Sequence, residues 1–545
     1  MSSGVKARLN SISIGISWFV ERIVVWVSIV FFLVVGILSL FVTVYLPDYN
    51  YRVVFSLENW WTTAIIALAA IFLVSLLNYC NFLNRVNLQT ILKILFFYTF
   101  ILGLGWIALA HVWPEWDSYD TFFVARGLNN PSLMPDCSIP SDETWAACAN
   151  GAMERYPYQL PLMFVFRMVN WIFGDGDYLA IEILNVFFTS FSFLLLGKLS
   201  HELFRDEKAV KITLLLCFFF VPQIIYVTFA YGNTLSLPFV LLALLFQCRS
   251  LREKKLNQGI ASAFFIIVAI LLKSTMIYVF MAMIVTWIVS LIKQFHWSEL
   301  ICIFLAVVFY VLSGFVIAGI GNQSGYETDK GLPKVVWIAM GLQRPQEAMP
   351  DNAGWYNGYP ASWPADNYDP EQAKLDSMES IQNSLKSFED DPWYAISFFS
   401  KKFLSEWTEP TYESLLASNW SSGRSDRPAM SDRPMSVVLH SMYYGKLHSI
   451  FSNICDVIQF LLLLGSAIAL FFYRKQLTVY QINIVMIPFG MALLYLLWEA
   501  QSQYIMPAYI MMIPLAGAGL AVIGQWGSGV LGKVVERCQK MSTSK

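Results

Sequence analysis

The sequence predicts an all-α integral membrane protein with about twelve transmembrane helices. Apolar residues make up 57% of the 545 positions and charged residues only 14%, whereas soluble domains carry roughly 25% charge. The mean hydropathy of +0.54 agrees with a membrane protein, and apolar runs long enough to cross a bilayer recur along the chain. The formal net charge of −2 gives no reason to expect a nucleic-acid partner.

Twelve apolar runs separated by polar segments are the expected spans. They lie near residues 24–46, 62–80, 94–112, 177–200, 212–225, 231–248, 259–272, 276–292, 299–320, 451–473, 478–498 and 505–526. The short pairs within 212–248 and 259–292 are each expected to form a helical hairpin. The chain then divides into an N-terminal extra pair of spans (1–93), a transmembrane module (94–320) with an outer loop at 113–176, an extracytoplasmic segment (321–450), and C-terminal helices with a cytoplasmic tail (451–545).

Basic residues recur in every second loop, which is the pattern of cytoplasmic loops. They precede the first span or follow an even-numbered one: Lys6, Arg8, Arg22, Arg85, Lys93, Arg205, Lys208, Lys211, Arg249, Arg252, Lys254, Lys255, Lys293, Arg474, Lys475, Lys533, Arg537 and Lys540. Both termini are therefore expected in the cytoplasm, and segments 113–176 and 321–450 on the opposite face. Residues 1–17 carry no small-residue cleavage site, so no cleaved signal peptide is expected.

The first outer segment begins with two acids among aromatic residues. Asp117 and Asp120 lie close to the span exit in HVWPEWDSYDTFFVAR. Tryptophan and tyrosine favour the headgroup level, so both carboxylates are expected where a lipid headgroup would be presented; a plain hydrated loop is the alternative. Farther along, Tyr156 to Phe173 is apolar but contains Arg167, which predicts a helix along the outer interface.

The second outer segment combines loop and helix. Residues 354–370, GWYNGYPASWPADNYDP, are rich in turn formers and predict a loop. Residues 373–387 and 393–407 have apolar positions at helical spacing and predict two helices.

Eight cysteines show no metal-ligand spacing. Cys137 and Cys148 share the first outer segment, and a disulfide between them is the simplest expectation on an oxidising face.

Further polar residues on the same face are candidates for substrate binding. Lys273 interrupts the apolar run AILLKSTMIY at an outward turn, and Glu499 and Gln503 follow the eleventh span in WEAQSQYIMP. Charged groups at membrane depth are costly, so function is the default hypothesis. Lys273 could instead extend to lipid phosphates, and Glu499 could cap a helix or pair with a cation. The remaining candidates come from the outer segments: Arg155, Tyr156, Arg344 and Lys402.

Carboxylates and cations at a membrane surface suit one reaction in particular. A sugar on a polyprenyl phosphate already carries a good leaving group, so no acid is needed to protonate it. The acceptor hydroxyl needs a general base, which an ionised aspartate within hydrogen-bond reach can supply. Cationic side chains would hold the departing phosphate and stabilise its charge. The candidates for that role are Lys273, Arg155, Arg344 and Lys402.

Four motifs occur in a characteristic order. They are WDSYDTFFVAR after an early span, YPYQLPLMFVFRMVNWIFGDGDYLAIEI leading into a later span, two short hairpins with Asn233 and LLKSTMIY, and the late EAQSQYIMP. Together they resemble the GT-C superfamily of membrane glycosyltransferases, which use polyprenyl-phosphate sugars, over roughly residues 94–292 and 478–526. The resemblance implies that Asp117 is the catalytic base, with Asp120 as the second choice. Because Gln503 stands where many relatives carry arginine, phosphate binding is expected chiefly from Lys273 and Arg155.

The sequence therefore predicts an inverting glycosyltransferase that moves one sugar from a polyprenyl-phosphate donor to an acceptor on the extracytoplasmic face. A bacterial plasma membrane is the expected location, with the endoplasmic reticulum as the alternative. The acceptor could be a cell-wall polysaccharide, a teichoic acid, a lipid or a protein, and a divalent metal is left open. The alternatives are a multispan transporter or flippase, and a polysaccharide polymerase or ligase. Transporters tend to show internal repeats and midplane sites, whereas this sequence shows no repeat and gathers its polar residues at one face.

Overall fold

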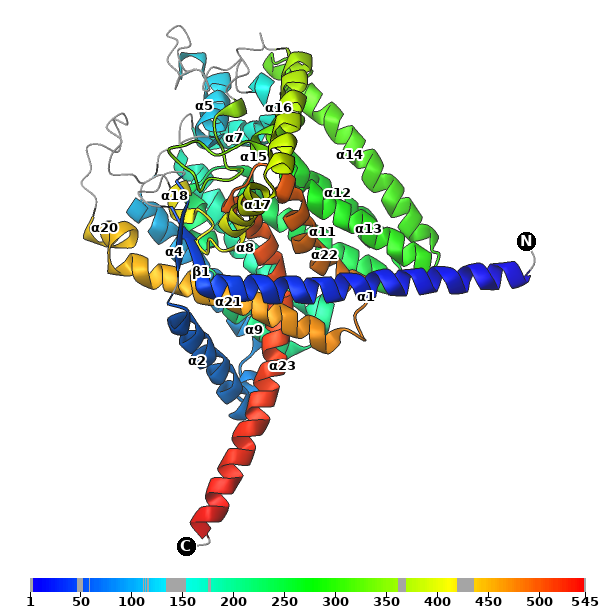
Figure 1. Cartoon of the computed structure of the whole chain (residues 1–545), viewed down its shortest axis with the longest axis vertical. Coiled ribbons are helices and arrows are strands. Elements are labelled where there is room, and N and C mark those ends of the chain that lie inside the picture. The colour runs from blue at the N-terminus through cyan, green and yellow to red at the C-terminus, as the bar shows by residue number, and fades with distance from the viewer. Residues whose placement is uncertain are drawn as a thin grey trace.

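The computed structural model is built almost entirely of helices, which confirms the all-α membrane class (Figure 1). It describes residues 3–46, 52–57, 59–110, 112, 114, 117–133, 153–174, 178–360, 369–418 and 436–543, with side chains from residue 21 onward except at 117 and 543. The predicted disulfide between Cys137 and Cys148 lies outside the described residues.

Within the described ranges, ten helices are long and apolar enough to cross a membrane. They are α1 (Ser3–Phe41), α2 (Trp60–Tyr79), α4 (Leu88–Ala110), α8 (Tyr178–Phe204), α11 (Gly232–Glu253), α13 (Ile277–Lys293), α14 (Trp297–Ser324), α21 (Lys446–Tyr473), α22 (Val479–Leu497) and α23 (Ser502–Thr543).

The two remaining predicted spans, near 212–225 and 259–272, correspond to a bent helix pair and to a shorter apolar helix. The helix α9 (Glu207–Phe219) is followed, at a bend of 55°, by α10 (Val221–Ile225) and the short helix η4 (Tyr226–Thr228). Pro222 lies in the first turn of α10, and proline is the usual cause of such a break. The helix α12 (Leu256–Leu272) is connected to α13 through η5 (Ser274–Met276) but packs chiefly against α11 and α14, so the expected hairpin of 259–292 is not a packed pair. The twelve predicted runs thus all correspond to helical elements.

The smaller elements lie between these helices. They are α3 (Phe82–Arg85), α5 (Asp117–Asn129), η2 (Pro131–Leu133), η3 (Pro157–Gln159), α7 (Leu160–Phe173), α15 (Val335–Leu342), α16 (Pro370–Asp390), α17 (Pro392–Trp407), α18 (Ser414–Ala417) and α20 (Val437–Tyr444). The two helices predicted at 373–387 and 393–407 are α16 and α17. The predicted interfacial helix is α7, which buries Phe166 and exposes Trp171 and Phe173, as an interfacial helix should.

One two-stranded sheet was not predicted. Strand β1 (Val42–Tyr45) pairs antiparallel with β2 (Val54–Leu57), with Val42 opposite Leu57 and Tyr45 opposite Val54. The first span was expected to reach residue 46, but the helix ends at Phe41. The residues that follow, VTVY, are β-branched and aromatic, which favours a strand.

Ionic contacts gather the predicted cytoplasmic loops at one end of the helical bundle. Glu202 at the end of α8 bonds to Arg205 (2.9 Å), Arg249 (2.8 Å) and Arg252. Two further ion pairs join Lys254 to Glu299 (2.6 Å) and Lys293 to Glu21. We call these eight residues the inner network.

Hydrogen bonds to uncharged acceptors extend the inner network to the neighbouring helices. The Lys208 amine donates to the Asn78 side chain, Gln481 to the Leu203 carbonyl, and Arg22 to the Arg474 carbonyl. The loops predicted to share one side of the membrane therefore do lie together.

The predicted outer segments meet at the opposite end. The Val44 amide donates to the Thr408 carbonyl (3.2 Å), and the Val53 amide to the Asn352 side chain (2.9 Å). The Leu332 amide donates to the Arg155 carbonyl (3.0 Å), which joins the first outer segment to the second.

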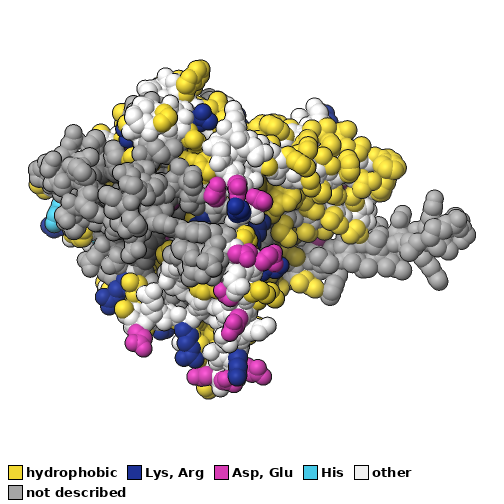
Figure 2. Space-filling model, turned by 90° about the horizontal axis from the view of Figure 1, so that it is seen from above, with side chains coloured by type: hydrophobic (Ala, Val, Ile, Leu, Met, Phe, Trp, Pro, Cys, Tyr) yellow, Lys and Arg dark blue, Asp and Glu magenta, His cyan; other side chains and the backbone are white. Residues whose placement is uncertain are grey.

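Exposed apolar residues cover the flank of the bundle. On α14 they include Phe304, Val311 and Phe315, which are 65%, 57% and 70% exposed. Figure 2, seen from above, shows a broad hydrophobic area where α14 lies, beside a strip of charged side chains. Such a continuous apolar surface suits contact with lipid.

Candidate active site

Lys273 lies at the turn that ends α12, and only 8% of its surface is exposed. The helix stops there because the Lys273 backbone is extended, at φ −147° and ψ 104°. Its amine lies 3.9 Å from the centre of the Tyr231 ring and 5.7 Å from that of Tyr504. A cation over an aromatic face is stabilised by the ring's quadrupole, more so when desolvated. The fold thus holds a positive charge at the outer end of α12.

Glu499 belongs to the short connection between α22 and α23, residues Trp498 to Gln501, which we call the α22–α23 link. It is 4% exposed. One carboxylate oxygen accepts from the Gln501 side chain (3.2 Å) and the other from the Tyr504 hydroxyl (3.2 Å). The Tyr504 ring also lies near the Lys273 amine. The predicted residues Lys273 and Glu499 therefore contact the same tyrosine, Lys273 at its ring and Glu499 at its hydroxyl.

Gln503 joins the same group from the first turn of α23. Its side-chain nitrogen donates to Glu413 (3.3 Å) and to Gln501, and its oxygen accepts from Asn233 (3.5 Å). The amide of Gln503 is therefore engaged by protein groups on both sides. We call Tyr231, Lys273, Glu499, Gln503 and Tyr504 the outer cluster.

The helix that carries the predicted base is anchored to this cluster. Asp117 begins α5, with its side chain outside the described set, and Asp120 is 8% exposed. The Ser118 hydroxyl lies 3.1 Å from the Tyr178 hydroxyl, which in turn donates to the Thr228 carbonyl (2.7 Å).

The same tyrosine continues the path toward Lys273. The Ala230 amide donates to the Tyr178 hydroxyl (3.1 Å), and Ala230 directly precedes Tyr231. From the end of η3, directly before α7, the Gln159 side chain donates to the Tyr231 hydroxyl (3.1 Å). The first outer segment is therefore fixed at two points to the loop whose tyrosine covers Lys273.

Arg155 and Tyr156 begin a row of aromatic rings. Arg155 is 6% exposed, and its guanidinium lies 5.6 Å from the Tyr156 ring. The Tyr156 ring lies 6.1 Å from that of Trp337 on α15. Trp337 and Trp498 are stacked with their planes 5° apart and their centres 6.1 Å apart. The row leads from Arg155 to the residue that precedes Glu499.

The other two predicted cations are placed differently. Lys402 on α17 is fully buried, and its amine donates to the Gly341 carbonyl (2.5 Å) and the Trp498 carbonyl (2.6 Å). Burial lowers the pKa of Lys402 to about 8, although the nearby Glu406 and Glu499 carboxylates oppose that change. Arg344 is exposed, with its guanidinium 4.5 Å from the Tyr394 ring.

Sequence reasoning missed three buried carboxylates. Glu406, Glu409 and Glu413 are 0%, 1% and 2% exposed. The Ser502 hydroxyl donates toward Glu409 (2.8 Å) and Glu413 (3.1 Å). The backbone amide of Gln503 also donates to Glu413 (3.2 Å). The signal was present in SEWTEPTYESLL, where three glutamates stand among aromatic residues at the end of α17 and in the connection to α18.

The electrostatic state of these carboxylates follows from their burial. Desolvation raises the pKa of Glu409, although hydrogen bonds from Thr411 and Ser502 oppose it. Desolvation and then the charge of Glu409 raise the pKa of Glu413 to about 8. Two carboxylates that share one hydroxyl donor in a dry site are expected to retain a proton at neutral pH.

The part of the chain that the structure describes contains no group of three or more His, Cys, Asp or Glu side chains placed to hold a metal ion. The site offers the desolvated Lys273 amine near the Tyr231 and Tyr504 rings. The Glu499 carboxylate is bonded to the hydroxyl of Tyr504. An anion near Lys273 would meet a charge that water screens only weakly.

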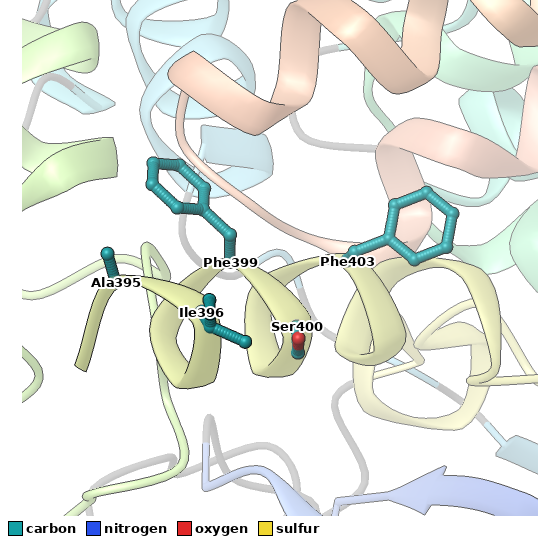
Figure 3. Close-up of a pocket in the computed structure, with 5 residues that line it drawn as sticks. All are labelled: Ala395, Ile396, Phe399, Ser400 and Phe403. Carbon is teal, nitrogen blue, oxygen red and sulfur yellow. The ribbon is translucent and has the colours of Figure 1, made fainter. Parts of the chain in front are cut away.

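A separate hollow lies on the outer face of α17 (Figure 3). Its volume is about 450 Å³, and its lining residues are Ala395, Ile396, Phe399, Ser400 and Phe403. The Phe403 ring lies 6.1 Å from Phe31 of the first span. Because the lining is apolar apart from one hydroxyl, the hollow offers no group suited to phosphate chemistry.

Comparisons with known proteins give little guidance on this arrangement. No protein-family model and no curated protein matches the chain. Among solved structures, the crystal structure of ArnT from Cupriavidus metallidurans bound to undecaprenyl phosphate is similar at 12% identity, over 78% of this chain and 77% of that chain, with a TM-score of 0.31. A TM-score this low supports no inference about the site, whose chemistry follows from its own residues.

Proposed function

We propose that this protein is an inverting membrane glycosyltransferase that takes a sugar from a polyprenyl-phosphate donor and passes it to an acceptor on the extracytoplasmic face. One observation carries the proposal. The buried amine of Lys273 lies against Tyr231, on the loop that anchors the acid-bearing helix α5 through Tyr178.

The chemistry needs two groups on opposite sides of the sugar's anomeric carbon. A base must take the proton of the acceptor hydroxyl, and a cation must stabilise the phosphate that leaves. Asp117 or Asp120 on α5 supplies the base, and Lys273 supplies the cation. The new bond forms as the bond from carbon to phosphate oxygen breaks, so the configuration at that carbon inverts.

The remaining predicted residues assist in distinct ways. Arg155 offers a second cation, and the Tyr156 ring beside it offers a face on which a sugar can stack. Glu499 accepts from Tyr504 and so orients one of the rings around Lys273. Gln503 holds the start of α23 between Asn233 and Glu413. Arg344 is exposed on α15's connecting loop, where it would meet only an acceptor that extends beyond the site.

The test is sugar transfer from a synthetic polyprenyl-phosphate donor by protein in lipid nanodiscs, with donor binding measured separately. Asp117→Asn preserves shape but removes the basic lone pair, and loss of a positioned base typically costs ~10²–10⁴-fold in rate. Donor binding should persist, because the phosphate and the lipid tail contact other groups. Asp120→Asn should do less damage if Asp120 only orients the base.

Several outcomes would change the assignment. Full turnover by Asp117→Asn together with an inactive Asp120→Asn would move the base to Asp120. Full turnover by both single variants and the double variant would contradict the proposed mechanism. Movement of the lipid without sugar transfer would favour the flippase alternative, and growth of a polymer on a diphosphate-linked lipid would favour the polymerase.

A further inference from the structure

Lys402 occupies a place that direct substrate binding does not explain. Its side chain is fully buried, and its amine donates to two backbone carbonyls, at Gly341 (2.5 Å) and Trp498 (2.6 Å). These carbonyls belong to the end of α15 and to the α22–α23 link, and they lie 61 and 96 positions from Lys402 in the chain. One amine therefore ties the outer segment to the connection that carries Glu499.

The backbone around this amine is packed without spare room. A Cβ atom at Gly341 would lie 2.5 Å from the carbonyl carbon and oxygen of Trp498. Gly354 has φ +72°, a conformation that side chains rarely adopt, and a Cβ there would lie 2.7 Å from Cε of Lys402. The Gly354 carbonyl accepts from the Ala500 amide (2.8 Å), which adds a second bond to the same link. The α22–α23 link is thus held from several sides around the Lys402 amine.

From this link the contacts lead directly to Lys273. Glu499 accepts from the Tyr504 hydroxyl (3.2 Å), and the Tyr504 ring faces the Lys273 amine at 5.7 Å. A displacement of the link would move Glu499 first, then Tyr504, and so alter the surroundings of Lys273. Catalytic geometry is sensitive to such movement, since a misplacement of about 1 Å can cost ~10²-fold in rate.

A charged residue is an unusual choice for a purely structural contact here. Burial of an ammonium group is costly unless it is paired and hydrogen-bonded, and apolar side chains of similar volume often stabilise a core as well or better. Unlike an apolar side chain, the Lys402 amine forms directional hydrogen bonds. These bonds hold the Gly341 and Trp498 carbonyls at fixed distances from the amine. Glu406 on α17 and Glu499 on the link lie close enough to favour its charged form.

We propose that Lys402 is a positioning residue, whose buried amine fixes the α22–α23 link against α15 and thereby places Glu499 and Tyr504 around Lys273. The proposal rests on the proposed function for its kinetic consequence. Its structural consequence, a link held in one place, stands independently of what reaction the protein performs.

The test compares Lys402→Met, which keeps the length of the side chain but removes the donors, with Lys401→Met. Lys401 is the adjacent residue, is 37% exposed and pairs with Asp351 at 2.8 Å, so its loss should leave the site unchanged. Hydrogen exchange of peptides covering 495–505 reports on the link. Donor KM and kcat report on the site.

For Lys402→Met we expect exchange in 495–505 to quicken about tenfold. We also expect kcat/KM for the donor to fall about 100-fold, with both a higher KM and a lower kcat. Lys401→Met should match the wild type in both readouts. If Lys402→Met does not accumulate as folded protein, Gly341→Ala tests the same contact, because its methyl group would push the Trp498 carbonyl away from α15.

Three results would overturn the proposal. A folded Lys402→Met or Gly341→Ala protein with wild-type exchange and kinetics would show that the contact positions nothing. Lost kinetics with unchanged exchange would mean that Lys402 itself touches substrate. Failure of both variants to fold would make the residue a determinant of the fold alone. Absence of sugar transfer by the wild type, with the exchange effect intact, would instead count against the proposed function.

Discussion

The two ends of the helical bundle use charged residues in opposite ways. The inner network joins carboxylates to cations of opposite sign, as in the three arginines around Glu202, and most of its cations are partly exposed. At the outer end, Lys402 is bonded to backbone carbonyls, Lys273 lies against an aromatic ring, and Glu413 accepts from Ser502 and Gln503. These outer groups are nearly all buried.

The difference indicates distinct roles. Oppositely charged pairs at the ends of spans fix helix against helix and satisfy the positive-inside bias. Charges held by rings, carbonyls and amides in a dry site keep much of their field, because water screens them weakly. The inner end is therefore expected to support the fold, and the outer end to act on a charged substrate.

The largest effect on stability is expected from the inner network. Glu202→Gln removes the charge that three arginines share. Because those arginines are 24–51% exposed, loss of the charge-assisted hydrogen bonds is expected to cost about 2 kcal/mol. Thermal unfolding in detergent should shift downward by several degrees, while the rate of sugar transfer per folded molecule stays within about twofold.

A matched control lies on α16. Glu371, 79% exposed, pairs with Lys374, 50% exposed, at 3.4 Å, and exposed pairs contribute no more than about 1 kcal/mol. Glu371→Gln should therefore change the unfolding temperature little. A Glu202→Gln protein with the wild-type unfolding temperature but without sugar transfer would contradict the distinct roles assigned to the two ends of the bundle.

A smaller effect is expected from the pH dependence of Glu413. Burial and the charge of Glu409 raise its pKa to about 8 in the folded protein, whereas the unfolded chain titrates near 4.3. Between these values the folded state holds a proton that the unfolded state has lost. Stability should therefore fall as pH rises from about 5 to 8, with a slope of about 1 kcal/mol per pH unit.

Glu413→Gln should flatten this slope, because the group no longer titrates. Some slope should remain, since the pKa of Glu409 is raised as well. Thermal unfolding of both proteins at half-unit steps between pH 5 and 8 measures the slope of stability against pH. An unchanged slope in the variant would show that Glu413 is already ionised in the folded protein.

Much of this organisation could be predicted from the sequence. Hydropathy and loop charge placed the spans, because the bilayer imposes length and composition on each one. The same patterns placed α7, α16 and α17 outside the spans. Lys273, Glu499 and Gln503 were singled out as costly polar residues near membrane depth, and the structure brings them into one cluster.

What could not be predicted depends on contacts between distant parts of the chain. Local sequence around Lys402 does not reveal that its amine meets Gly341 and Trp498. Likewise, the hydroxyl that Glu409 and Glu413 share comes from Ser502, 93 and 89 positions away. The hairpin of β1 and β2 was missed because its apolar residues continue the composition of the preceding span.

The central claim is that the buried Lys273 amine binds the phosphate of a lipid-linked donor. Its most direct test is the affinity of nanodisc-embedded protein for a sugar-free polyprenyl phosphate, measured for the wild type, Lys273→Met and Lys401→Met. Hydrogen bonds between charged groups contribute about 1.5–3 kcal/mol, so Lys273→Met should bind about 10- to 100-fold more weakly, and Lys401→Met as the wild type does. Equal affinity of all three proteins would contradict the account.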